Sequence, residues 1–196
     1  MNILIIAVYY DNIRLEIICV IFMEYYCIFV KSGEEEKFKA KAQEKISAAG
    51  LNGQFYFFSE EAWNKKAKFK NKITRPAFPG YVFLKIDHLV PEIVFLVRKI
   101  DGFVRFLPTT QEIHKIEGAA SDELIRFIET GERHLMSKAV YEKGNKVRII
   151  SGDIKTFEAY ITHWDPKHQK VRVQLPNQCI SWAFELSYDI VMEKLL

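Results

Sequence analysis

Short apolar runs and amphipathic stretches alternate through the first half of the chain. Residues 25–30 form an aromatic and β-branched run, which is typical of a fully buried strand. Beyond it, Phe38, Ala42 and Ile46 recur every four residues, so we expect an amphipathic helix that ends at Gly50. The first elements are therefore a buried strand and an amphipathic helix.

The start of that helix carries a capping signal. Ser32 can cap the helix, and Glu35 stands three residues further on, which completes a capping box. Later elements are expected as strands over residues 54–58, 81–86 and 103–107, a helix from Pro91 to Arg98, and a last helix from Ser121 to about Gly131. This order, β-α-β-β-α-β-α, predicts an α+β domain of the ferredoxin-like or split βαβ type.

After this first domain, expected over residues 23–130, the hydrophobic period changes to two. Apolar residues alternate with basic or polar ones over residues 146–150 and again over residues 170–175. Several short strands at such spacing predict a small antiparallel β-barrel over residues 142–196. Residues 131–141 show no such order, and we expect them to form a linker.

The first 22 residues are strongly apolar, yet Asp11, Arg14 and Glu16 stand in their middle. A membrane-spanning helix needs about 20 mostly uncharged residues, and a secretory signal begins with basic residues that are absent here. We therefore expect residues 1–22 to be an apolar leader outside the native protein, with translation starting at Met23. A membrane anchor and an extra strand are the alternatives.

Composition narrows the class of protein. The chain has 196 residues, 49% of them hydrophobic and 27% charged, which is a globular balance and excludes a disordered chain. A net charge of +3 permits nucleic-acid binding without requiring it. The three cysteines, Cys19, Cys27 and Cys179, lack metal-binding spacing and fit reduced thiols in the cytoplasm.

Enzymatic chemistry has little support in the sequence. The histidines are scattered, and no zinc-protease, serine-hydrolase or phosphate-loop motif occurs. Cys27 lies inside a predicted buried strand, where a thiol acts as a small hydrophobic group. We expect a binding protein, not an enzyme, with no metal and no cofactor.

Three motifs, in this order, carry a family resemblance. They are Tyr25-Tyr26 leading into Lys31-Ser32-Gly33-Glu34, then Phe78-Pro79-Gly80-Tyr81-Val82-Phe83, and Val147-Arg148-Ile149-Ile150-Ser151-Gly152. With them the chain resembles NusG-type transcription elongation factors, and in particular specialised paralogues of the RfaH, LoaP and UpxY type. The resemblance implies a NusG N-terminal (NGN) domain followed by an SH3-like barrel of the KOW type.

In this family an aromatic surface of the first domain grips the clamp helices of the largest RNA polymerase subunit. The resemblance assigns polymerase binding to five aromatic residues, namely Tyr26, Phe78, Tyr81, Phe83 and Phe103. Strand parity places Tyr81 and Phe83 on one face, opposite Val82 and Leu84. That favours one core face and one aromatic face that an isolated domain would leave partly exposed. The alternative is that these aromatics are ordinary core.

Nucleic-acid contacts are a second implication of the resemblance. Lys31 and Arg98 match positions that lie near non-template DNA in RfaH-like relatives, and phosphate attraction would supply the contact. The lysine-rich stretch from Lys65 to Arg75 falls where the family carries a variable hairpin or loop. In both places solvated surface residues are the alternative.

The barrel departs from the family pattern in two places. Ala159 stands where the family usually has glycine. Residues 176–180 replace a segment that general NusG proteins use to bind a ribosomal protein and the termination factor Rho, which puts both contacts in doubt. Trp164, Trp182 and Tyr188 are candidates for binding another partner, or they are core.

From these features we expect a specialised elongation factor that acts as a monomer on bacterial RNA polymerase and promotes antitermination of particular operons. Its barrel would recruit RNA, the ribosome or a termination component. The alternatives are a housekeeping NusG and an RNA- or ribosome-binding KOW module. Because the barrel segments alternate at period two, we expect a β-barrel and no helices from it over the polymerase face.

Overall fold

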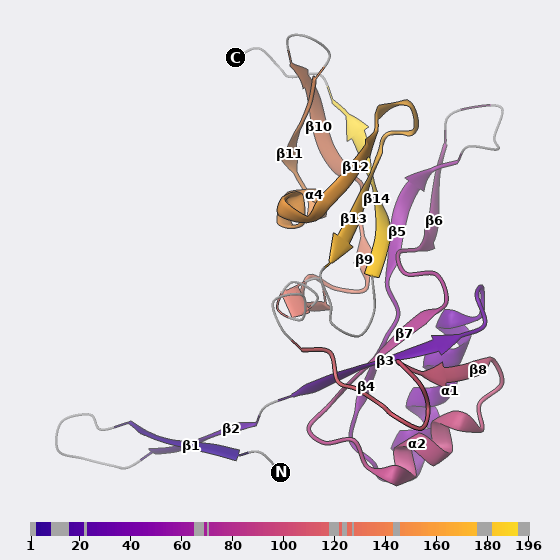
Figure 1. The fold of residues 1–196 in the computed structure, drawn as a ribbon, viewed down its shortest axis with the longest axis vertical. Coiled ribbons are helices and arrows are strands. Elements are labelled where there is room, and N and C mark those ends of the chain that lie inside the picture. The colour runs from indigo at the N-terminus through magenta and orange to yellow at the C-terminus, as the bar shows by residue number, and fades with distance from the viewer. Residues whose placement is uncertain are drawn as a thin grey trace.

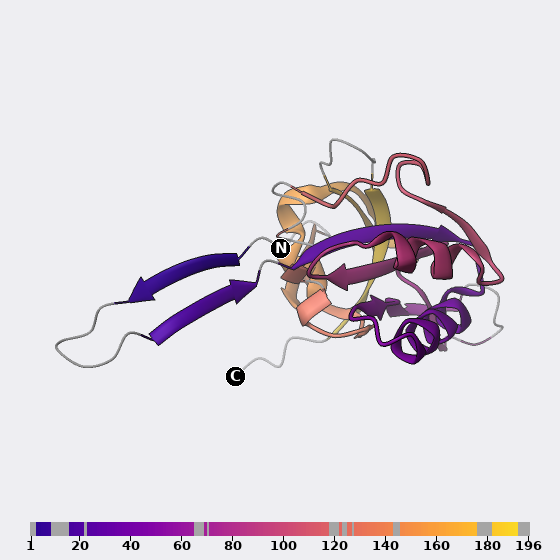
Figure 2. The same cartoon turned by 90° about the horizontal axis from the view of Figure 1, so that it is seen from below.

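A computed structural model describes residues 3–8, 16–21, 23–64, 69, 71–117, 122, 125–126, 128–142, 146–175 and 182–191 (Figure 1). Near the N-terminus, β1 (Ile3–Val8) and β2 (Glu16–Ile21) form an antiparallel hairpin. Figure 2 shows that this hairpin projects away from the rest of the molecule. None of the described helices is long and apolar enough to cross a membrane.

The first domain is built on a four-stranded antiparallel sheet in the order β4-β7-β3-β8. Its strands are β3 (Glu24–Val30), β4 (Gln54–Tyr56), β7 (Tyr81–Ile86) and β8 (Phe103–Phe106). Helices α1 (Glu35–Ala48) and α2 (Pro91–Arg98) lie together against one face, as Figure 2 shows. This is the expected ferredoxin-like arrangement.

Side-chain alternation along β3 and β7 divides the sheet into two faces. Ile28, Val82 and Leu84 point toward the helices and form a core with Phe38 and the rest of the α1 stripe. On the opposite face, Cys27 and Phe83 belong to a second cluster. The parity expected for β7 is therefore present.

The ends of the helices lie close to the predicted positions, but the predicted cap of α1 is wrong. Gly50, in the left-handed region at φ +67°, lies two residues after the end of α1, and Pro91 opens α2. The N-cap of α1 is Glu34 and makes no side-chain cap, so the expected capping by Ser32 is absent. Of the last predicted helix, Ser121 lies outside the described residues, and Gly131 follows its described helical residues.

The lysine-rich stretch is flanked by a hairpin of β5 (Ser59–Trp63) and β6 (Lys72–Pro76). Lys65, Lys66, Lys68 and Lys70 lie outside the described residues. Strand β9 (Arg133–His134) pairs with β5 in parallel, and β10 (Ser137–Glu142) follows it closely. Within the segment expected to be a linker, residues 133–134 and 137–141 thus lie in strands, which pair with strands of both domains.

The C-terminal domain is a five-stranded sheet in the order β11-β10-β14-β13-β12. Its further strands are β11 (Lys146–Ser151), β12 (Ile161–Asp165), β13 (Lys170–Leu175) and β14 (Trp182–Ile190), and the short helices are α4 (Asp153–Thr156), η1 (Glu158–Tyr160) and η2 (Pro166–His168). Neighbouring strands are antiparallel except β10 and β14, which pair in parallel. Where a small antiparallel β-barrel is expected, the structure thus shows a sheet-rich domain, and the parallel pairing of β10 with β14 departs from the expected antiparallel pattern.

Gly152 shows why this domain needs a glycine after β11. Its φ is +102°, and a Cβ there would lie 2.7 Å from the Cα of Ser137. The close approach of Gly152 to Ser137 lets the Ser137 hydroxyl accept a hydrogen bond from the Ile154 N–H at 3.1 Å. A side chain at position 152 would separate β10 from α4.

Candidate functional site

Two of the three sequence motifs meet at one buried carboxylate. Glu35 is 2% exposed, and its Oε2 accepts a hydrogen bond from the Gly33 N–H at 2.8 Å. Its Oε1 accepts another from the Gly80 N–H, also at 2.8 Å, across 45 residues of sequence. Charge-assisted bonds of this kind are among the stronger ones in proteins, so Glu35 joins the turn before α1 to the turn before β7.

Gly80 is required at this junction by conformation and by space. Its φ is +84°, and a Cβ would lie 2.7 Å from Cε2 of Phe29. The Tyr81 N–H donates to the Phe78 carbonyl at 3.1 Å, which closes the turn. The turn thereby sets the directions in which Phe78 and Tyr81 leave the backbone.

An aromatic cluster occupies the sheet face opposite the helices. Phe58, Phe78 and Phe83 are mutually in contact, with ring-centroid distances of 5.4–6.0 Å. These separations suit edge-to-face and tilted ring packing, which stabilises beyond the burial of area alone. Phe58 was not among the expected site residues, because it lies beyond the end of β4 and carries no motif. We call these three residues the aromatic face.

The C-terminal domain covers the aromatic face. Phe184 of β14 packs on Phe78 with ring centroids 4.6 Å apart, and it contacts Phe157 at 5.4 Å. Phe58, Phe78 and Phe83 are consequently all buried in one cluster that spans both domains. The ring that meets Phe78 belongs to a strand and not to a helix.

One border of the aromatic face remains partly open. Tyr81 packs on Phe29 with ring centroids 5.4 Å apart, and both are half-buried. The Arg105 guanidinium lies 5.4 Å from the Phe29 ring centre, within the range of a cation–π contact. Burial raises the pKa of the Tyr81 hydroxyl, the negative charge of a Cys27 thiolate would add to the rise, and Arg105 opposes it.

Two of the expected polymerase-binding residues lie elsewhere. Tyr26 points to the helix side of β3, where it is 7% exposed and its hydroxyl donates to Glu24 at 2.8 Å. Phe103 also packs on the helix side, with its ring centroid 5.7 Å from that of Phe106. The structure therefore brings together Phe78, Phe83 and Tyr81, but neither Tyr26 nor Phe103.

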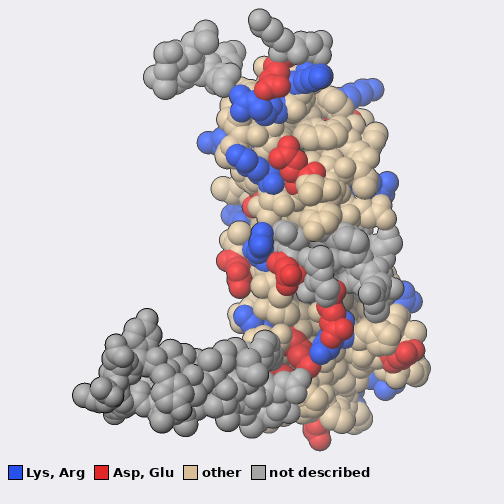
Figure 3. Space-filling view, turned by 60° about the vertical axis from the view of Figure 1, so that its left-hand side comes forward, with Lys and Arg blue, Asp and Glu red and all other residues tan. Residues whose placement is uncertain are grey.

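The residues expected near DNA are both exposed. Lys31 follows β3 and forms an ion pair with Glu34 at 3.1 Å. Arg98 ends α2 and lines an open groove of about 560 Å³ with Phe95 and Thr110. On the face drawn in Figure 3, acidic and basic side chains are interspersed along both domains. Among the described residues of that face, there is no broad surface of one sign.

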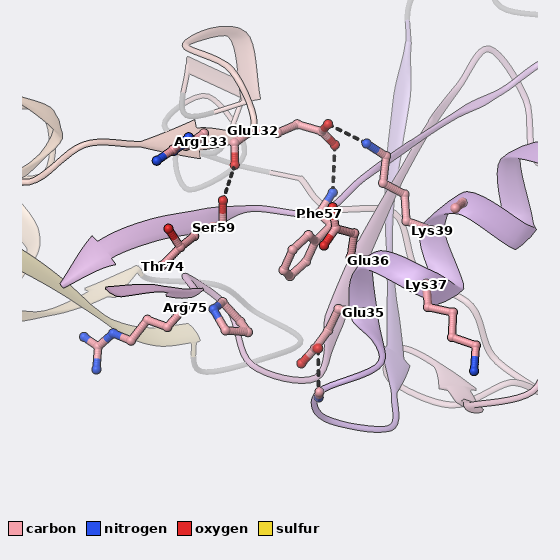
Figure 4. A pocket seen from close by; sticks show the side chains of 13 residues that line it. Glu35, Glu36, Lys37, Lys39, Phe57, Ser59, Thr74, Arg75, Glu132 and Arg133 are labelled. Atoms are coloured by element: carbon pink, nitrogen blue, oxygen red, sulfur yellow. Dashed lines mark hydrogen bonds and ion pairs between the residues drawn. The ribbon is translucent and has the colours of Figure 1, made fainter. Parts of the chain in front are cut away.

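A glutamate that the sequence did not single out attaches the start of β9 to the first domain. The Glu132 carboxylate accepts hydrogen bonds from the Lys39 ammonium and from the Phe57 N–H, the latter at 3.0 Å. Its carbonyl accepts from the Ser59 N–H at 2.8 Å. Figure 4 shows Glu132 beside a cleft that opens between α1 and the β5–β6 hairpin. The cleft has a volume of about 910 Å³.

Ionisable side chains border the seam between the domains. Glu60 is bound by Arg75, whose guanidinium also lies 3.9 Å from Glu185 of β14. His134 lies 2.7 Å from Asp153 of α4. No sequence motif marks these groups, since they meet only after the domains pack.

The aromatic candidates of the C-terminal domain are largely core. Tyr188 is fully buried, and its ring lies 6.2 Å from that of the half-buried Trp164. The side chain of Trp182 and residues 176–180 lie outside the described residues, so the expected partner contacts there stay predictions. Ala159 lies exposed in η1. Among the described residues, no cluster of His, Cys, Asp and Glu could hold a metal ion.

Comparison with known proteins decides the family. A family model described as "Transcription termination factor nusG" matches residues 23–125, which is more than half of the chain. The chain belongs to the NusG family. The first two of the three sequence motifs, which meet at Glu35 and Gly80, both fall within the matched residues.

Individual NusG proteins are similar to the chain at modest identity. The "Transcription termination/antitermination protein NusG" of Thermus thermophilus is 25% identical over 166 residues, or 78% of this chain and 89% of that protein. The protein of the same description from Staphylococcus carnosus is 28% identical over 134 residues, or 65% and 72%.

One solved structure shares the fold. It is described as "Domain interaction in Thermotoga maritima NusG" and superimposes with a TM-score of 0.50 at 23% identity, covering 85% of this chain and 94% of that one. The shared fold therefore extends over both domains of the present chain.

Proposed function

We propose that this NusG-family protein is a specialised elongation factor that binds bacterial RNA polymerase and promotes antitermination of particular operons. The observation that carries the proposal is the aromatic face. Phe58, Phe78 and Phe83 form a compact aromatic surface on the sheet side that the domain's own helices leave uncovered. Aromatic residues are enriched in protein–protein interfaces, and this surface fits the family's binding to the clamp helices.

Polymerase and the C-terminal domain would compete for this surface. Phe184 occupies the aromatic face in the present structure, so a clamp helix can reach Phe78 only after the C-terminal domain moves away. The half-buried pair of Tyr81 and Phe29 borders the covered region and offers a first point of contact. In this proposal the protein exists in a closed form and in an open, polymerase-binding form.

A pull-down of the full chain with RNA polymerase, with and without ribonuclease, tests the proposal. We expect polymerase to be retained after ribonuclease treatment, because the contact is made by protein surfaces. Retention of ribosomes alone, or loss of polymerase with ribonuclease, would contradict the proposal and support an RNA- or ribosome-binding module.

A housekeeping NusG role is the second candidate, and one finding favours it. The relatives from Thermus thermophilus and Pseudomonas aeruginosa are both described as "Transcription termination/antitermination protein NusG", and each aligns over more than three quarters of this chain. Transcript profiling of a strain that lacks the gene distinguishes the specialised role from the housekeeping role. A change limited to a few operons supports the specialised role, and a change across most transcripts supports the housekeeping role.

A further inference from the structure

A buried carboxylate lies where the two domains meet. Glu60 of β5 is 3% exposed. It accepts hydrogen bonds from the Arg75 guanidinium, with Nε at 2.7 Å and Nη2 at 2.6 Å from its Oε1. The backbone N–H of Ser187, on β14 of the other domain, also donates to it. The hydrogen bond from Ser187 therefore crosses the seam.

Charged or titratable groups lie on every element packed around Glu60. Arg75 comes from β6 and Glu185 from β14, and Glu185 is in turn bound by Lys170 of β13. His134 of β9 is the partner of Glu60 in the parallel register. The arrangement holds two carboxylates, Glu60 and Glu185, on a single arginine.

The neighbouring carboxylate provides a contrast. Glu61 points to the other side of β5, where it forms ion pairs with Lys72 at 3.4 Å and with Arg133 at 3.8 Å. Lys72 belongs to β6 and Arg133 to β9, and both strands lie outside the sheet of the C-terminal domain. Only Glu60 of this pair is bound by β14 of the C-terminal domain.

We propose that Glu60 is a proton-sensitive latch, so that the C-terminal domain covers the aromatic face more completely in mild acid than above neutral pH. The regulatory consequence for polymerase rests on the proposed function, whereas the docking equilibrium is a property of the chain alone.

The direction in which docking depends on pH follows from the cost of burying a charge. Burial raises the pKa of Glu60 to about 7, since the loss of hydration outweighs the attraction of Arg75 and the Ser187 hydrogen bond, and Glu185 adds to the rise. When β14 leaves, Glu60 regains water and its ordinary pKa of 4.5. The closed form thus binds the proton more tightly. Docking is strongest below the ordinary pKa and weakens as pH rises toward about 7.

The expected size of the effect can be measured. With these two pKa values, the closing constant should fall about tenfold between pH 6 and pH 8. Amide hydrogen exchange of Ser187 in the full chain, corrected for the intrinsic pH dependence of exchange, reports this constant as a protection factor. We expect that factor to drop about tenfold, while the factor at Ile28, inside the first domain, stays unchanged.

Two variants isolate the role of Glu60. In Glu60→Gln the side chain keeps its shape and stays uncharged, so the protection of Ser187 should lose most of its dependence on pH. Glu61→Gln removes the adjacent carboxylate and should behave as the wild type. Equal protection of Ser187 at pH 6 and pH 8 in the wild type would overturn the latch. So would an unchanged pH dependence in Glu60→Gln, because a group other than Glu60 would then be responsible.

The latch and the polymerase proposal fail separately. Hydrogen exchange is measured without polymerase, so a normal exchange result with no polymerase binding would contradict only the proposed function. A pH-independent Ser187 with intact polymerase binding would contradict only the latch.

Discussion

The two faces of the β4-β7-β3-β8 sheet are both buried, but they differ in what covers them and in chemistry. The helix face is mostly aliphatic, with Ile28, Val82 and Leu84 packed under α1 and α2 of the same domain. The opposite face is rich in aromatic residues and is covered by Phe184 from the other domain. A covering element from the same compact unit stays in place while the domain is folded, whereas a second domain can leave.

Buried ionisable groups also lie beside the aromatic face. Glu60 and His134 are buried at the seam beside the aromatic face, and each pairs with a charged group. Buried ionic groups contribute little net stability, because desolvation offsets most of their attraction. A buried face can thus be permanent core or a reversible interface, and its composition distinguishes the two.

The largest effect should come from the helix face. Ile28 is fully buried, and Ile28→Ala should lower the free energy of unfolding by about 2–5 kcal/mol through lost burial and a residual cavity. Urea denaturation of the full chain measures it. A loss below about 1 kcal/mol would mean that the helix face is as easily opened as the aromatic one.

A loss of similar size is expected at the glycine that orients the aromatic face. Gly80→Ala suffers the left-handed φ of +84° and the contact with Phe29, whereas Gly33→Ala, at φ +89°, meets no atom within 4 Å. The conformational cost is about 1–2 kcal/mol in both, and the contact adds roughly 1–3 kcal/mol in Gly80→Ala. Equal urea midpoints for the two variants would show that the Phe29 ring yields without cost.

The aromatic border should matter for binding more than for stability. Tyr81→Ala should weaken polymerase binding about tenfold or more, while the free energy of unfolding falls by about 1 kcal/mol. Phe95→Ala is the matched control, because Phe95 is an exposed aromatic residue on α2, away from the aromatic face. If Tyr81→Ala instead unfolds much more easily at unchanged affinity, Tyr81 is core.

The smallest effect should be on secondary structure. The C-terminal strands alternate at period two, so the domain should remain β when it moves away from the aromatic face. Far-UV circular dichroism of the full chain should therefore be the same at pH 6 and pH 8, although docking differs. Growth of a helical signal at pH 8 would show that opening includes a change of fold.

Strand parity and turn residues were predictable from the sequence, because they depend on neighbours along the chain. Alternation assigned Tyr81 and Phe83 to one face and Val82 and Leu84 to the other, as observed. The same rule places Tyr26 on the helix side, because Tyr26 lies two residues before Ile28 on one strand. It was grouped with the polymerase-binding residues through its motif instead, and the structure places it on the other face.

Contacts between distant segments were decided only by the tertiary structure. Glu35 was expected to complete a capping box with Ser32, but one of its oxygens bonds to Gly80, 45 residues away. The latch at Glu60 depends on β14 reaching β5. Strands β9 and β10 form within the expected linker because their pairing partners belong to the two domains beside them. A local pattern determines which face of an element is apolar. Which element covers that face depends on packing across the whole chain, and only the folded molecule contains that information.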